Sequence, residues 1–241
     1  MKKLVFLLMV MVSFPTMARQ FDIEVIIFKR NVAPETINES WPDKLPAIDY
    51  TDTKVYADFT GVRKLPSSSY RLKRQYEALQ NHAGFTPLFH AAWRQGDWSS
   101  RRAPVFHIQA GQNFASQFNP DGTPIEPGQV VSTTPLYELE GTLQVYVQHY
   151  LFTKVNLDLR KPGQREVVIG ADIEQPVEAV EDGTESDAVV VGQLQQIEKQ
   201  VEVESFLKTF RMQQLRKMGS GEIHYLDHPL MGMLIYVRKL D

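Results

Sequence analysis

Residues 138–160 read ELEGTLQVYVQHYLFTKVNLDLR, and the pattern in this stretch decides the fold. Its odd-numbered positions from Leu139 to Leu159 are almost all apolar, whereas its even-numbered positions are mostly polar, charged or aromatic. A helix repeats every ~3.6 residues and cannot keep a strict period of two, so the stretch is predicted to be β-structure with its odd face buried. Strands usually run to about ten residues, which leaves one long bent strand or two strands joined without a strong turn signal. The sequence KPGQ at 161–164 is predicted to end it.

Strand patterns also occur on both sides of this stretch. Strands are predicted at residues 21–28, near 54–59, and at 87–93, 105–109, 206–215, 222–226 and 230–237. The first and the last are apolar on both faces, as is typical of strands in the middle of a sheet.

One main helix is predicted at about residues 67–83, where apolar residues recur at helical spacing behind three serines that could cap its N-terminus. The sequence therefore predicts an α+β domain with a mostly antiparallel β-sheet, this helix, and a C-terminal three-strand meander.

The first residues differ from the rest of the chain. Lys2 and Lys3 precede nine consecutive apolar residues, and Thr16-Met17-Ala18 offers a cleavage site. Nine apolar residues fall well short of the roughly 20 that cross a bilayer as a helix. Residues 1–18 are therefore interpreted as a cleaved secretory signal, and residues 19–241 as a single globular domain without a transmembrane segment.

Composition narrows the possible functions. The chain has no cysteine, which excludes disulfides and a lipoprotein signal, so stability must come from a core for which the 43% hydrophobic residues suffice. A net charge of –3 does not fit a nucleic-acid-binding protein. Residues 170–198 hold eight acidic side chains and no Lys or Arg, and they are predicted to form a mobile acidic loop.

Two motifs suggest catalysis or metal binding, and both have a simpler interpretation. His224 and His228 have the i, i+4 spacing of zinc ligands on a helix, but here they lie in a strand that leads into a turn. Glu138 and Glu140 share a strand face like a glycosidase carboxylate pair, yet acidic residues are common on the solvated face of a strand. No catalytic residue, metal or cofactor is predicted, and the chain is not predicted to be an enzyme.

The even face of 138–160 is a candidate binding surface. Tyr146, Tyr150 and Lys154 lie on it, and Arg216 and Lys217 follow near the C-terminal turn. Aromatic rings can stack on sugar rings while cations meet carboxylates, which suits a sugar polymer. The alternative is that the helix at 67–83 or a loop covers the rings, which would then belong to the core.

Several segments resemble the CsiV family. They are FDIEVIIF at 21–28, ESWP at 39–42, LFHAAWRQ at 88–95, GTL at 141–143, LDL at 157–159, Phe210-Arg211 and, most distinctively, RKMGSGEIHYLDHPLMG at 216–232. The resemblance spans essentially the whole chain after the predicted signal.

The resemblance implies a soluble periplasmic protein of Gram-negative bacteria that binds peptidoglycan. It also implies a role in promoting peptidoglycan synthesis, through the outer-membrane lipoprotein that activates a class A penicillin-binding protein. The family supplies no binding residues, so Tyr146, Tyr150, Lys154, Arg216 and Lys217 are the peptidoglycan-binding hypothesis from this sequence. Two alternatives stay open, a wall-active glycan hydrolase that uses Glu138 and Glu140, and a protein-interaction module without glycan affinity.

Overall fold

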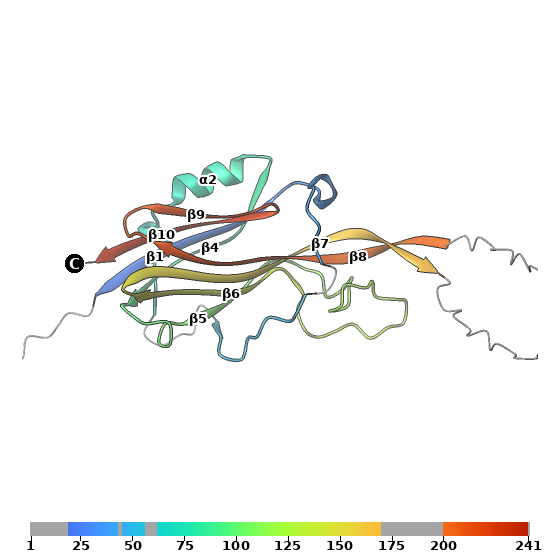
Figure 1. Ribbon diagram of the computed structural model, residues 1–241, viewed down its shortest axis with the longest axis horizontal. Helices are drawn as coiled ribbons and strands as arrows, with labels where there is room; N and C mark the ends of the chain where they lie inside the picture. The colour runs from blue at the N-terminus through green and yellow to red at the C-terminus, as the bar shows by residue number, and fades with distance from the viewer. Residues whose placement is uncertain (1–18, 43–44, 56–61, 170–199, 241) are drawn as a thin grey trace, which may run out of the picture.

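Figure 1 shows the computed structural model, which describes residues 19–42, 45–55, 62–169 and 200–240. The strands are β1 (Gln20–Arg30), β2 (Lys54–Val55), β3 (Arg63–Lys64), β4 (Phe85–Gly96), β5 (Val105–Asn113), β6 (Tyr137–Gln148), β7 (Tyr150–Ile169), β8 (Gln200–Met218), β9 (Ile223–His228) and β10 (Met231–Leu240). The helices are η1 (Pro34–Thr36), η2 (Ser67–Ser69) and α2 (Lys73–Asn81). The predicted signal at 1–18 and the predicted acidic loop at 170–198 lie outside the described residues.

The strands form two five-stranded sheets. The first has the order β3-β4-β1-β10-β9 and the second the order β2-β5-β6-β7-β8. The pairs within both sheets are antiparallel, apart from the short parallel pair of β2 with β5. The predicted α+β class, with a mostly antiparallel sheet and one main helix, is confirmed.

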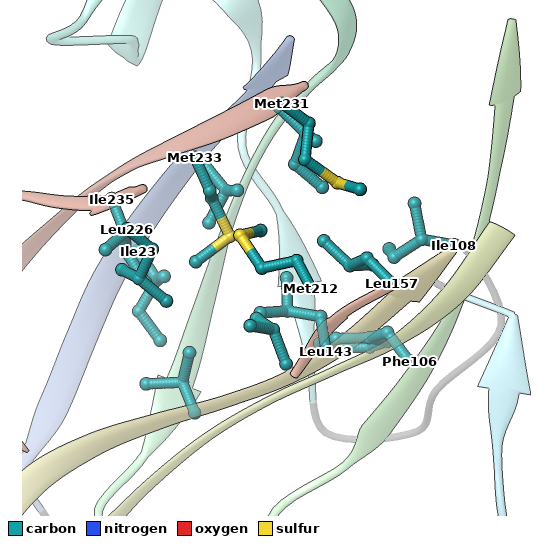
Figure 2. Packing of buried hydrophobic residues seen from close by; sticks show 14 of the residues in the cluster. Ile23, Phe106, Ile108, Leu143, Leu157, Met212, Leu226, Met231, Met233 and Ile235 are labelled. Carbon is teal, nitrogen blue, oxygen red and sulfur yellow. The ribbon is translucent and has the colours of Figure 1, made fainter. Parts of the chain in front are cut away.

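The two sheets share one core between their facing sides. Figure 2 shows Met233 of the first sheet pointing toward Met212 of the second, and Met231 pointing toward the side of Ile108 and Leu157. The odd residues of β1 join this core, whereas Ile26 and Phe28 point to the other side, where they pack with Leu72 under α2. This arrangement explains why β1 is apolar on both faces, because a helix covers the side of the first sheet that faces away from the core.

The long alternating stretch consists of two strands. Chain reversal occurs at His149, whose φ of 60° is left-handed, and Gln148 then pairs with Tyr150. Paired residues lie on the same face of a sheet, so pairing of even with even residues carries the alternation unbroken through the turn. The prediction that 161–164 end the stretch is wrong. Beyond Leu159, β7 continues to Ile169 paired with β8, and no strand among the described residues pairs with its other edge. Pro162 is tolerated there because a strand edge needs no hydrogen bond from its N–H.

The helix is shorter than the predicted span of 67–83. The serines form the separate turn η2 without capping any helix, and α2 begins only at Lys73. A carboxylate from β1 explains the delayed start, because Glu24 accepts hydrogen bonds from the backbone N–H groups of Arg71 and Leu72 at 2.5 and 3.1 Å. Among the described residues, no helix is long and apolar enough to cross a membrane.

The three predicted C-terminal strands follow one another as β8, β9 and β10. β9 and β10 pair in the first sheet, with β10 next to β1. β8 pairs with β7 in the second sheet, so the meander passes from one sheet to the other at the turn before β9.

Candidate functional site

The hairpin between β6 and β7 carries the most exposed aromatic ring of the predicted site. Tyr150 is 57% exposed, and the Lys217 Nζ atom lies 3.2 Å from the centre of its ring. Strand pairing explains why Lys217 meets Tyr150. Lys217 is paired with Phe152, which puts it on the same sheet face as the even residues of β7, Tyr150 among them. This contact is a cation–π interaction, which holds a positive charge against the ring.

A shallow concavity extends from this ring across the end of β8. It is lined by Tyr150, Arg216, Lys217, Met218, Gly219, Glu222, Ile223 and His224. Lys154 is exposed on the same face as Tyr150 but lies outside the concavity, about 13 Å along β7 at the usual rise of a strand. Arg216 pairs with Thr153 and therefore lies on the opposite sheet face from Lys217, although both line the concavity at the end of β8. We call Tyr150, Lys154, Arg216 and Lys217 the hairpin patch.

Tyr146 is buried, in contrast to the rest of the predicted set. Only 8% of it is exposed, and its ring stacks on that of Phe152 at a centroid distance of 5.4 Å. The β4–β5 connection crosses this face, since the side chain of Gln144 donates hydrogen bonds to the carbonyls of Ser100 and Ala103 at 2.8 and 3.0 Å. The core interpretation therefore applies to Tyr146, although a loop rather than α2 lies over this face.

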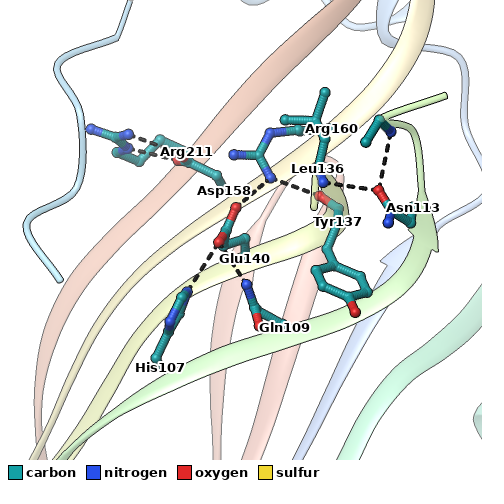
Figure 3. A network of polar contacts seen from close by, with 10 residues as sticks. His107, Gln109, Asn113, Leu136, Tyr137, Glu140, Asp158, Arg160 and Arg211 are labelled. Carbon is teal, nitrogen blue, oxygen red and sulfur yellow. Dashed lines mark hydrogen bonds and ion pairs between the residues drawn. The ribbon is translucent and has the colours of Figure 1, made fainter. Parts of the chain in front are cut away.

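The other end of the same face holds a network of charged groups (Figure 3). Glu140 accepts hydrogen bonds from His107, Gln109 and Arg160 at 3.0, 3.0 and 2.9 Å. Burial raises the pKa of Glu140, but the hydrogen bond from Gln109 and the charge of Arg160 outweigh it and hold the pKa below its ordinary value. The network therefore favours the ionised form of Glu140, and both of its carboxylate oxygens accept hydrogen bonds.

Two further ion pairs complete the charged groups of this region. Asp158 receives both Nε and Nη2 of Arg211, at 2.7 and 2.8 Å, in a bidentate pair. Glu138 receives Lys29 Nζ at 2.5 Å and the backbone N–H of Gln112 at 3.2 Å. Both members of the glycosidase-like pair, Glu138 and Glu140, are thus buried and bound to cations.

The two histidines of the zinc-like motif have separate local partners. His224 Nε2 lies 3.0 Å from the carbonyl oxygen of Gly219, and His228 Nδ1 accepts a hydrogen bond from the N–H of Leu230 at 3.2 Å. They are four residues apart on β9, so their backbones are separated by about 13 Å, and each ring is bound to a different local backbone group. The described residues hold no group of three or more His, Cys, Asp or Glu side chains that could bind a metal.

A comparison with family models decides which proteins this chain is related to. A model described as "Peptidoglycan-binding protein, CsiV" matches residues 1–240. The chain belongs to the CsiV family. No curated protein and no solved structure matches it. Peptidoglycan binding is the function that membership of the CsiV family indicates.

The most distinctive CsiV-like block of the sequence, residues 216–232, folds around the concavity. It contains the end of β8, the turn at Gly219 and Gly221, the whole of β9 and the start of β10. Sequence reasoning found Arg216 and Lys217 but missed Glu222 and His224, which the turn brings to the same concavity. Glu222 and His224 reach the concavity because β9, in the first sheet, lies beside the end of β8, in the second. The alternation of residues within one strand cannot predict a contact between two sheets.

Proposed function

We propose that this protein is a non-catalytic accessory protein of the periplasm, exported by its first 18 residues, that binds peptidoglycan through the hairpin patch. The observation that carries the location of the site is the Tyr150 ring, 57% exposed, with Lys217 against it. An exposed aromatic ring is a ready surface for the apolar face of a pyranose. Lys217 lies against the ring, and the exposed part of Tyr150 is available to a sugar.

The cations of the patch suit the peptide part of the polymer. Lys154, Arg216 and Lys217 are exposed, and each can approach a carboxylate of a peptide stem from solvent. Such exposed pairs are screened over about 8–10 Å near physiological ionic strength, so salt should weaken this part of the binding. Glycan stacking on Tyr150 should persist at high salt.

The state of the two glutamates supports a binding role over hydrolysis. A glycoside hydrolase needs one protonated carboxyl group as general acid, and its pKa must be raised. The pKa of Glu140 is instead lowered, and Glu138 is bound to Lys29. Incubation with purified sacculi should therefore release no soluble muropeptides, and their release would identify a hydrolase.

The accessory role rests on the family resemblance. The proposed partner is the outer-membrane lipoprotein that activates a class A penicillin-binding protein, and the expected effect is faster peptidoglycan synthesis. The measurement is the glycan polymerisation rate of the synthase with its lipoprotein activator, with and without this protein. An unchanged rate would contradict the role in synthesis and leave peptidoglycan binding in place.

Co-sedimentation with purified sacculi tests the site. We expect Tyr150→Ala to weaken binding about 3- to 10-fold, in line with ~0.5–1.5 kcal/mol for an aromatic contact. Lys217→Ala should also weaken binding, and its effect should disappear at high salt. Tyr225→Ala is the matched control, because Tyr225 is 41% exposed and stacks on Phe28 on the helix-covered side of the first sheet.

Circular dichroism must confirm that each variant is folded. If folded Tyr150→Ala sediments as well as the wild type, the hairpin patch is not the site. If a folded protein of wild-type sequence fails to sediment with sacculi at all, the chain is a protein-interaction module without glycan affinity.

A further inference from the structure

A row of arginines crosses the first sheet on its helix-covered side. Strand pairing sets Arg63 opposite Arg94, Arg94 opposite Asp22, and Asp22 opposite Arg238. These four residues come from β3, β4, β1 and β10 and lie side by side in one cross-strand row. Asp22, the member of the row on β1, lies two residues before Glu24, whose carboxylate binds the backbone N–H groups just before α2.

One carboxylate serves two of these three arginines. Asp22 receives Nε and Nη2 of Arg94 at 2.5 and 2.9 Å, and Nη2 of Arg238 at 2.6 Å. The side chain of Arg63 is exposed and forms no hydrogen bond or ion pair within the part of the chain that the structure describes, while its backbone belongs to the β3–β4 pair. The row therefore carries three positive charges against one negative charge.

The position of Arg63 is electrostatically unfavourable in the free protein. Like charges directly opposite each other on neighbouring strands destabilise a sheet, and Arg63 lies opposite Arg94. An anion between the two guanidinium groups would reverse this effect. A bound anion would therefore reduce the repulsion between these two side chains.

A concavity of about 210 Å³ lies where such an anion would bind. Its lining includes Arg63, Arg94, Gln20 and Gly96. Neighbouring strands are about 4.8 Å apart, so the two guanidinium groups can reach the same small anion. A guanidinium group presents a planar fork of N–H donors, whose geometry matches a carboxylate. Nε and Nη2 of Arg94 are bound to Asp22, so Arg63 supplies the fork for the ligand and Arg94 adds the N–H groups of Nη1.

We infer that Arg63 and Arg94 form a carboxylate-binding site for the peptide stems of peptidoglycan, with Arg238 as a further cation along the row. The inference rests on the proposed peptidoglycan binding but uses a different surface from the hairpin patch. Glycan strands freed of peptides offer no stem carboxylates, whereas each intact stem carries them. The arginine row therefore binds the peptide stems through their negative charge, whereas Tyr150 binds the sugars of the glycan strand.

Two forms of the polymer separate the two sites. One is intact sacculi. The other is glycan strands from which an amidase has removed the peptide stems, with the lactyl carboxyl groups that this cleavage frees then converted to amides. We expect Arg63→Ala to weaken binding to intact sacculi at least about 5-fold at low salt, as expected for a charge-assisted hydrogen bond, and to leave binding to bare glycan strands unchanged. Tyr150→Ala should weaken binding to both forms.

Arg74→Ala is the matched control, since Arg74 is an exposed arginine of α2 outside the row. Arg63→Lys keeps the charge but loses the planar fork, so it should bind intact sacculi with an intermediate affinity. The side chain of Arg63 has no hydrogen-bond or ion-pair partner among the described residues, so its replacement should leave the thermal unfolding midpoint near that of the wild type.

The outcomes distinguish this site from the hairpin patch. Equal loss of binding to intact and bare polymer in Arg63→Ala would overturn the carboxylate site, and so would no loss to either. Loss confined to intact sacculi, together with wild-type behaviour of Tyr150→Ala, would keep the arginine site and remove the hairpin patch.

Discussion

At the scale of the residue, Glu140 makes stability depend on pH. Its carboxylate is buried and is bound by His107, Gln109 and Arg160. Burial alone raises its pKa, yet the hydrogen bonds and the charge of Arg160 hold the pKa below the ordinary value of 4.5. A carboxylate whose pKa is lower in the folded than in the unfolded chain binds protons preferentially after unfolding. Its stabilising contribution is therefore complete above about pH 5 and is lost as the pH falls through the folded pKa.

We expect Glu140→Gln to be less stable than the wild type at pH 7, by about 1–3 kcal/mol. The difference should shrink as the pH falls below 4.5, because the wild type then loses the same charge. Free energies of unfolding from urea titrations between pH 7 and pH 3 measure both effects. Glu77→Gln on the exposed face of α2 is the control. A difference that stays constant with pH would show that Glu140 is not ionised through this network.

At the same scale, single residues mark where sequence reasoning succeeds and fails. The buried odd face of 138–160 was predictable, because alternation reports which side of a strand is apolar. The burial of Tyr146 was not, because a loop far away in the sequence supplies the cover through Ser100 and Ala103. The bonds of Glu140 to Arg160 and His107 were equally hidden, since they join three strands.

At the scale of the element, β10 shows what a central strand contributes. Its odd residues Met231, Met233, Ile235 and Val237 are all buried in the shared core. The sequence predicted this strand from its apolar residues on both faces, and it predicted β1 in the same way. The start of α2 at Lys73 could not be predicted, because the carboxylate that binds the preceding N–H groups belongs to β1.

Ile235→Ala should destabilise the protein by about 2–5 kcal/mol, the usual cost of a cavity in a packed core. Ile223→Ala is the matched control, because Ile223 lies on β9, the strand that pairs with β10, and is 45% exposed. Its effect should stay below about 1 kcal/mol. Denaturant unfolding followed by circular dichroism compares the two. Equal effects would mean that β10 does not contribute to the core as described.

At the scale of the whole molecule, the two sheets should unfold together. Trp93 of the first sheet is buried and meets Phe106 of the second edge to face, with ring centroids 5.2 Å apart. Trp41 makes a similar contact with Phe210 of β8, at 5.0 Å. We expect one cooperative transition, because neither sheet can keep its apolar face buried without the other.

Tryptophan fluorescence and far-ultraviolet circular dichroism should therefore give the same midpoint in one denaturant titration. Fluorescence reports on the contact between the sheets, and circular dichroism reports on the strands. Ile235→Ala in the first sheet should shift both midpoints equally. Two separate transitions would show that residues 19–241 do not form a single domain.

The ribbon of β7 and β8, which runs on past the ends of β5 and β6 (Figure 1), has a consequence for how this protein can vary in length. Ile169 is paired with Gln200, so the two ends of the intervening segment are held side by side whatever its length. From the pair of Leu159 with Phe210, this point is ten residues farther along the ribbon, about 33 Å. Doubling the length of a chain segment closed in this way costs only about 0.6 kcal/mol. Insertions and deletions between the two strands should therefore change the free energy of unfolding little. The ribbon also keeps them far from the core between the two sheets.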